Sequence, residues 1–70
     1  MTVQLHRHRR TGQLFVIRKE EVREDGVWCV CEWVDLRAGI LLHTGHVQRF
    51  RPKALQPTHC DVLVEIESWR

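Results

Sequence analysis

The chain has 70 residues, of which 43% are hydrophobic and 29% are charged, so its composition is that of an ordinary globular domain and its length allows only one domain. A chain of this size buries about 60% of the surface that it exposes when unfolded, which leaves a small core and little room for a deep, enclosed active site. Eleven Lys and Arg against nine Asp and Glu give a net charge of +2, which is too mild to indicate nucleic-acid binding by itself.

The charges and cysteines add expectations about location. Residues 1–23 carry six Arg and Lys against two Glu, whereas residues 54–70 carry one Arg against three acidic residues. The longest aliphatic run, residues 38–42, is too short for a signal sequence or a membrane span. Cys29, Cys31 and Cys60 cannot all pair within one chain, and reduced thiols are typical of a cytoplasm. We therefore expect a soluble cytoplasmic protein that is neither exported nor bound to a membrane.

The first half of the chain is cut into short segments that alternate with a period of two, which predicts strands rather than helices. Residues 3–8 are expected as the first strand, with a hairpin turn at residues 10–12. Residues 14–17 are apolar on both faces, as in a strand that is buried on two sides, and residues 18–21 are expected to run out into solvent.

A polar turn at residues 23–26 leads into the strongest predicted strand, residues 27–34, which is rich in Val and Trp. Strict alternation places Trp33 and the cysteines on one face of this strand and Trp28 on the other. Residues 35–39 are expected to end it. A further strand is expected over residues 40–51, with a break near residues 43–46 and a bulge between Val47 and Phe50 if both are in the core.

The remaining residues predict a helical turn followed by one strand. Pro52 is suited to the first position of a short turn through Leu55, and residues 60–67 alternate as a half-buried strand. Four or five short antiparallel strands with one helical turn near Pro52 to Leu55 predict an all-β domain over residues 1–70, folded as a small barrel that is closed or nearly closed. Closure removes exposed strand edges.

Part of the sequence resembles a known family. Over residues 30–57, the matching segments are Val30-Cys31-Glu32-Trp33-Val34-Asp35 and Val47-Gln48-Arg49-Phe50-Arg51-Pro52-Lys53-Ala54-Leu55-Gln56-Pro57. They are similar to the YodC-like family of small bacterial proteins of unknown function, which has a Cys-x-Trp-Phe-Asp type strand and a closing Phe-x-Pro-x-x-Leu-x-Pro type segment. The resemblance implies an SH3-like barrel and brings no catalytic residue. Tudor and KOW modules, which have related folds, bind peptides or nucleic acid, although a shared fold alone does not assign a function.

We therefore expect a binding module that is not an enzyme and needs no cofactor. The leading hypothesis is recognition of a protein or peptide through a shallow aromatic and basic surface, formed by Trp28, Arg49, Phe50, Arg51 and Lys53. Trp28 is favoured as the exposed aromatic residue because only one face of its strand can line a narrow barrel, which leaves Trp33 for the core.

Two alternatives stay open. Nucleic acid could bind the Arg-rich surface formed by Arg7, Arg9, Arg10, Arg18 and Lys19, since Arg pairs well with phosphate oxygens; a solvated strand end explains the same residues without a ligand. The second alternative is a homo-oligomer in which the strand edge at residues 61–69 pairs with a copy of itself.

Metal binding and catalysis have weaker signals. Zinc could in principle use Cys29, Cys31, His43, His46, His59 and Cys60. Only one residue separates the first two cysteines, which lie within a predicted strand among Val and Trp, so buried reduced thiols are favoured and no metal is expected. Cys60 beside His59 is the only cysteine next to a histidine, and neighbours in a strand point to opposite faces, so the two side chains are not expected to meet.

Overall fold

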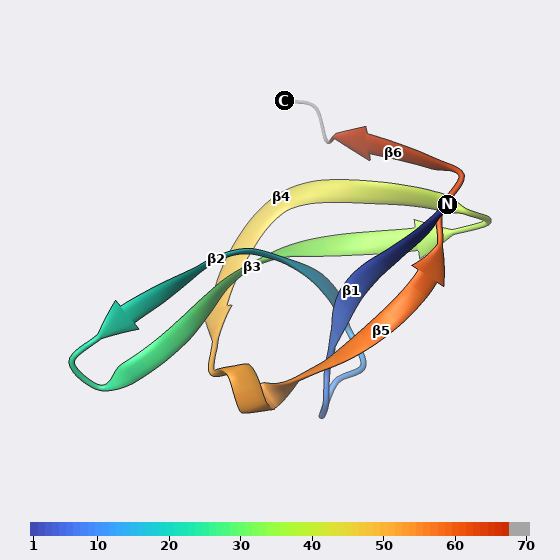
Figure 1. The fold of residues 1–70 in the computed structure, drawn as a ribbon. Coiled ribbons are helices and arrows are strands. Elements are labelled where there is room, and N and C mark those ends of the chain that lie inside the picture. The colour runs from blue at the N-terminus through green and yellow to red at the C-terminus, as the bar shows by residue number, and fades with distance from the viewer. Residues whose placement is uncertain (68–70) are drawn as a thin grey trace.

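Six strands and one 3-10 turn make up residues 1–67, the part of the chain that the computed structural model describes (Figure 1). They are β1 (Thr2–His8), β2 (Leu14–Arg23), β3 (Gly26–Arg37), β4 (Ile40–Phe50), the turn η1 (Pro52–Ala54), β5 (Leu55–Asp61) and β6 (Val64–Glu67). The predicted all-β class and the turn beginning at Pro52 are confirmed. No helix within residues 1–67 has the length and apolar character needed to cross a bilayer.

The last predicted strand is divided into two. Within residues 60–67, the backbone N–H of Val62 donates to the carbonyl of Met1 at 2.7 Å, and that of Leu63 donates to the carbonyl of Gly39 at 2.8 Å. The chain therefore leaves β1 at Val62 and continues along β4 as β6. Four or five strands were expected because alternation alone does not show where a strand changes its partner.

The six strands form one sheet in the order β5-β1-β2-β3-β4-β6, in which β4 and β6 are parallel and the other neighbours are antiparallel. Within residues 1–67, the edge strands β5 and β6 do not pair with each other, so the sheet is not closed into a barrel and the SH3-like barrel is not confirmed. The two edges are joined by the covalent link through Val62 and Leu63 instead (Figure 1). The strand edge expected in residues 61–69 is present as β6, whereas residues 68 and 69 lie outside the described residues.

Both faces of β2 are covered by apolar side chains, as its sequence predicted. Leu14 and Val16 pack against one cluster, whose buried members are Leu5, Val34, Leu41 and Val62. Phe15 and Ile17 belong to the other, together with the buried residues Cys29, Cys31 and Leu55. Because alternate residues of a strand face opposite sides, the small domain has two half-cores, one on each face of the sheet.

An arm of the sheet extends beyond these clusters, as residues 18–21 predicted. β2 pairs with β1 only through Leu14 and Phe15 and then continues to Arg23 against β3 alone. The C-terminal end of β3 lies at Arg37, three residues beyond the end predicted at residue 34. Ala38 and Gly39 then turn the chain with φ angles of 51° and 78°, as in the tight two-residue hairpin turns that favour positive φ.

The break expected near residues 43–46 is a bulge in β4. Glu32 pairs with Val47 and Val34 pairs with His43, so residues 44–46 of β4 lie opposite a single residue of β3. Gly45, with φ of 81°, supplies the backbone conformation that this bulge requires. A bulge between Val47 and Phe50 was expected only if both side chains were in the core. Val47 is 49% exposed, so this condition is not met, and the register there is regular.

Candidate functional site

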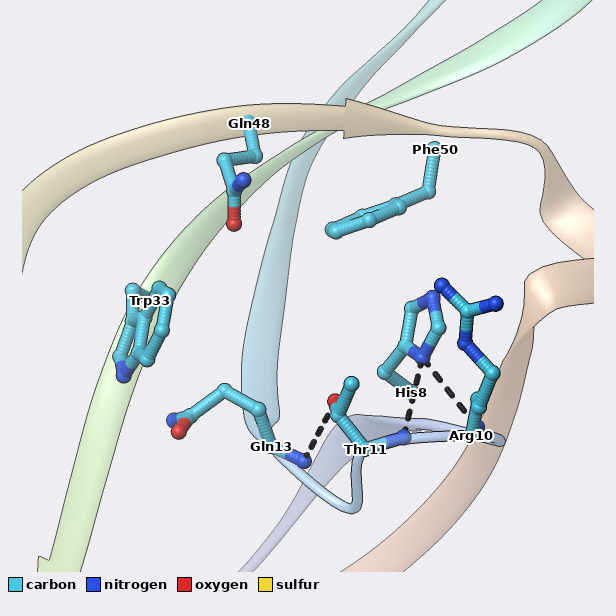
Figure 2. Close-up of a pocket in the computed structure, with 7 residues that line it drawn as sticks. All are labelled: His8, Arg10, Thr11, Gln13, Trp33, Gln48 and Phe50. Carbon is cyan, nitrogen blue, oxygen red and sulfur yellow. Dashed lines mark hydrogen bonds between the residues drawn. The ribbon is translucent and has the colours of Figure 1, made fainter.

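Two adjoining hollows lie on the face of β3 and β4 that carries Trp33. The larger, of about 320 Å³, lies between the β1–β2 turn and the end of β4 (Figure 2); it is lined by His8, Arg10, Thr11, Gln13, Trp33, Gln48 and Phe50. The second, of about 300 Å³, is lined by Trp33, Thr44 and His46. Trp33 belongs to both, so we treat them as one site and call it the aromatic groove.

The aromatic groove is supported from below by a buried ring. Phe15, which is 2% exposed, makes edge contacts with Trp33 and Phe50 at centroid distances of 5.7 and 5.0 Å. The His8 ring lies 4.8 Å from Phe50, and the His46 ring lies 5.4 Å from Trp33. These tilted and edge-on arrangements are the favourable geometries for aromatic pairs, so the rings have fixed positions before any ligand arrives.

The β1–β2 turn forms a pre-organised rim. The His8 Nδ1 atom accepts hydrogen bonds from the backbone N–H groups of Arg10 and Thr11 at 3.2 and 3.3 Å (Figure 2). Thr11 Oγ1 in turn accepts the N–H of Gln13 at 3.3 Å. Within residues 1–67, the guanidinium of Arg10 makes no hydrogen bond or ion pair, so a cation at this rim stays available to a ligand.

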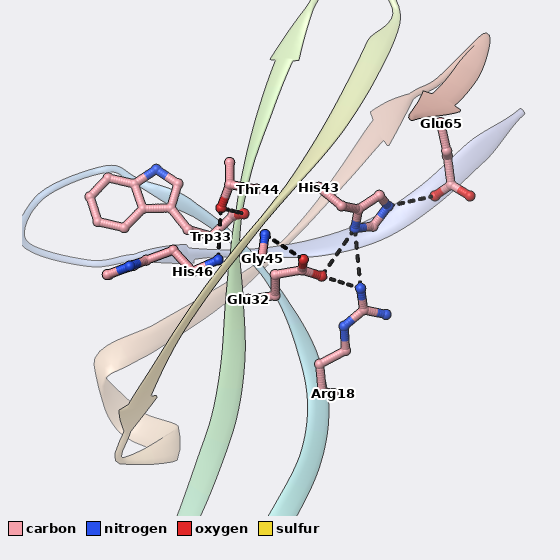
Figure 3. A network of polar contacts seen from close by, with 8 residues as sticks. All are labelled: Arg18, Glu32, Trp33, His43, Thr44, Gly45, His46 and Glu65. Carbon is pink, nitrogen blue, oxygen red and sulfur yellow. Dashed lines mark hydrogen bonds and ion pairs between the residues drawn. The ribbon is translucent and has the colours of Figure 1, made fainter. Parts of the chain in front are cut away.

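Behind the second hollow, on the opposite face of the sheet from Trp33, a buried carboxylate holds the bulge of β4 (Figure 3). Glu32, which is 5% exposed, accepts the backbone N–H of Gly45 through Oε2 at 2.8 Å and a hydrogen bond from Arg18 through Oε1. His43, equally buried, places Nδ1 3.2 Å from the same Oε1. Burial raises the pKa of Glu32, but the hydrogen bonds from Gly45, Arg18 and His43 outweigh it and hold the pKa below its ordinary value of 4.5.

This network connects the bulge to its neighbours. Thr44 Oγ1 donates to the carbonyl of Trp33 at 2.7 Å and accepts the N–H of His46 at 3.1 Å. On the far side, the Nε2 atom of His43 lies 3.6 Å from a carboxylate oxygen of Glu65 on β6 (Figure 3). The residues that position the second hollow are therefore fixed by hydrogen bonds on both sides of β4.

The structure does not gather the five predicted partner-binding residues into one surface. Phe50 lies in the aromatic groove, whereas Arg49 and Arg51 point to the opposite face, because neighbours in a strand alternate. Arg49 donates to both carboxylate oxygens of Glu21, at 3.0 and 3.4 Å, and these bonds, with a smaller contribution from Arg23, lower the pKa of Glu21 to about 2. Lys53 lies in η1, where its carbonyl accepts a hydrogen bond from the Arg9 side chain at 2.9 Å.

Trp28 and Arg51 form a separate cluster on that opposite face. The guanidinium of Arg51 lies 4.0 Å from the centre of the Trp28 ring, a cation–π contact. Asp25 holds both side chains, accepting the indole N–H of Trp28 and a guanidinium N–H of Arg51, each at 3.1 Å. One ring face of Trp28 is thus covered from within the chain.

The basic residues of the nucleic-acid alternative are also divided. Arg7, Arg9 and Arg10 lie at the β1–β2 turn, where Arg7 donates to the carbonyl of Gly12 at 2.9 Å. Arg18 and Lys19 lie on β2 beyond its pairing with β1, and each faces a carboxylate, Glu32 and Glu21 respectively. Arg10 is the member of this group that stands at the aromatic groove.

The cysteines are free, and Cys29 and Cys31 are buried, as predicted. Burial, with a smaller contribution from Cys29, raises the pKa of Cys31 to about 11, so this thiol is inert at neutral pH. Cys60 is half-buried against the other apolar cluster. No group of three or more His, Cys, Asp or Glu side chains within residues 1–67 is placed to hold a metal ion.

Sequence reasoning missed most of the aromatic groove. Trp33 was expected in the core; it packs there on one side, yet it also lines both hollows. One feature of the sequence could have indicated this role of Trp33: the glycine-containing break at residues 43–46 of β4, which lies opposite Trp33. No sequence pattern indicated a binding role for His8, Gln13 or Gln48. The groove joins residues from β1, β3, β4 and a turn, and only the fold brings them together.

Comparison with known proteins adds no relative: no family model matches the chain, and neither the curated proteins nor the solved structures include a match. The resemblance to the YodC-like family stays a prediction, and a functional proposal has to rest on the geometry of the site.

Proposed function

We propose that the chain is a non-catalytic binding module that recognises a peptide segment of a partner protein in the aromatic groove. The observation that carries this proposal is the pair of rings, Trp33 and Phe50, in a preformed groove whose polar rim includes the guanidinium of Arg10, which has no partner among residues 1–67. Binding pockets are typically concave, largely apolar and furnished with a few polar groups, and aromatic and Arg side chains are the commonest energetic anchors of protein interfaces.

The charge arrangement favours a peptide over a nucleic acid. Phosphate binding needs several unpaired cations along one surface, whereas most of the basic side chains of the predicted surfaces already contact carboxylates or carbonyls within the chain. Gln13, Gln48 and Thr11 at the rim can instead exchange hydrogen bonds with peptide groups. Single-stranded nucleic acid is the second candidate because Arg10 stands beside Phe50, on which a base could stack.

A homo-oligomer formed through β6 has less support. Glu65 and Glu67 lie on this edge strand, and two copies paired there would bring like charges close together. On the fold, we infer a relationship to SH3-like barrels, supported by the resemblance over residues 30–57 and by the covalent link at Val62 and Leu63 that joins the two edges of the curled sheet.

The proposal is tested by selecting peptides from a displayed random library and measuring the affinity of the tightest clone by fluorescence anisotropy. Trp33→Ala is expected to weaken binding by about thirtyfold, as loss of an aromatic anchor does. Arg10→Glu, a change at an exposed turn, should reduce the affinity for clones with acidic residues. Trp28→Ala, on the opposite face, is the matched control and should bind like the wild type.

Two other results would overturn or replace this proposal. Loss of binding in Trp28→Ala with full binding in Trp33→Ala and Arg10→Glu would move the site to the opposite face and overturn the proposal. If no clone binds and single-stranded oligonucleotides bind with an affinity that falls steeply with salt, the second candidate replaces the first.

A further inference from the structure

The far edge of β4 is only partly occupied. β3 pairs with one edge of β4 along most of its length, and β6 pairs with the other edge from Ile40 to His43. Within residues 1–67, no strand pairs with that second edge over residues 44–50. Alternate residues of an unpaired edge present their N–H and C=O groups outward, so this stretch is a template for one more strand.

The other free edge of the arm, in β2, is protected by charge, whereas the edge of β4 is not. Five of the six residues 18–23 of β2 are charged, which is a common way to prevent a strand from joining an edge. Residues 44–50 contain one charged residue, Arg49, and its guanidinium is held by Glu21 on the face of the sheet. Of the two free edges of this arm, the edge of β4 is therefore the one that charge does not protect against strand addition.

The bulge sets where an added strand can begin. The backbone N–H of Gly45 donates to Glu32, and that of His46 donates to Thr44 Oγ1, so both amides already have partners. After the bulge, residues 47–50 return to a regular register against β3. The open part of the edge is this regular segment.

The side chains of β4 place this edge along the aromatic groove. Thr44 and His46 line the second hollow, and Gln48 and Phe50 line the first. A strand added beside β4 directs every second side chain to the same face, where these hollows lie. In strand addition, backbone hydrogen bonds supply affinity and pockets for alternate side chains supply specificity.

We propose that an extended, acidic peptide segment binds as an added strand along residues 47–50 of β4. An apolar or aromatic side chain of the peptide fills the hollow between Trp33 and Phe50, and a carboxylate pairs with the guanidinium of Arg10 at the rim. This inference rests on the proposed function, because it describes how the partner segment binds in the aromatic groove.

The test uses the full chain and the tightest peptide clone from the displayed library, resynthesised with single N-methyl groups at each position in turn. Strand addition predicts an alternating pattern, in which about tenfold affinity is lost at every second position near the anchor and the positions between are tolerated. Ester replacement, which removes the N–H without adding a methyl group, is the matched control and should give the same pattern. The outward-pointing amides, every second one in residues 47–50, should also exchange hydrogen more slowly in the complex.

The failures of the two proposals can be told apart. If all N-methylated and ester peptides bind equally and residues 47–50 show no added protection, strand addition is wrong. Should Trp33→Ala still weaken binding in that case, the peptide occupies the groove without pairing with β4 and the proposed function stands. Insensitivity to both backbone changes and Trp33→Ala overturns both.

Discussion

Replacement of Glu32 by Ala tests whether the buried carboxylate fixes the bulge of β4. The substitution removes the acceptor of the Gly45 N–H and the partner of the buried His43 ring, and it releases Arg18. Removal of one member of a buried charged network costs about 3–5 kcal/mol, since the remaining polar groups lose their partners while staying out of water. The Arg18 side chain is 46% exposed and regains solvent, so its share of this cost is small.

This cost is large for so small a domain. At about 0.05–0.15 kcal/mol per residue, a chain of 70 residues has a total stability of about 4–10 kcal/mol. Glu32→Ala is therefore expected to remove a third or more of the free energy of unfolding. Glu32→Gln keeps an oxygen for the Gly45 N–H and should cost about 1–2 kcal/mol, and Arg18→Ala should cost about 1 kcal/mol or less.

Urea unfolding followed by tryptophan fluorescence gives these free energies directly. From most to least stable, the expected order is wild type, Arg18→Ala, Glu32→Gln and Glu32→Ala. The dependence of the unfolding free energy on urea concentration should be similar for all four proteins. A Glu32→Ala variant within about 1 kcal/mol of the wild type would refute the assignment of the carboxylate as the group that fixes the bulge.

Three further predictions concern the turn, the thiols and acid. Ala38→Asn should raise the free energy of unfolding, measured by urea titration, by about 0.5–1 kcal/mol, because Asn tolerates the φ of 51° better than Ala does; a loss of stability would contradict the turn assignment. In the folded protein at pH 8, iodoacetamide should modify Cys60 well before Cys31, and mass spectrometry of the labelled peptides would show the reverse order if the burial is wrong. The hydrogen bonds from Arg49, with a smaller contribution from Arg23, lower the pKa of folded Glu21 from 4.5 to about 2, so its stabilising contribution is complete above pH 4.5 and is lost as the pH falls towards 2. Glu21→Gln should therefore lose less stability than the wild type over that range, and identical losses in urea titrations would disprove this contribution.

Local patterns predicted the strands well because each depends on a few neighbouring residues. The apolar run of residues 14–17 showed that β2 is covered on both faces, and the glycine break near residues 43–46 located the bulge. The same patterns could not show that the chain leaves β1 at Val62 to join β4. That change depends on hydrogen bonds to the backbone carbonyls of Met1 and Gly39, which are distant in sequence.

The site was harder to predict for a related reason. Trp28 was expected at the binding surface on the premise of a narrow closed barrel, and Asp25 and Arg51 instead hold its side chain on the face opposite the aromatic groove. Phe50 was assigned to the site and lies in the groove, but its companions His8 and Trp33 come from other strands. Long-range packing decides which exposed aromatic residue becomes part of a groove, and no single segment contains that information.

The central claim is that the aromatic groove, rather than the opposite face, binds the partner, and one NMR titration tests it most directly. With the tightest peptide clone added to 15N-labelled full chain, the indole N–H of Trp33 and the amides of residues 47–50 should shift in proportion to occupancy, while the indole N–H of Trp28 stays in place. Shifts at Trp28 and Arg51 with an unchanged Trp33 would contradict the claim and assign binding to the opposite face.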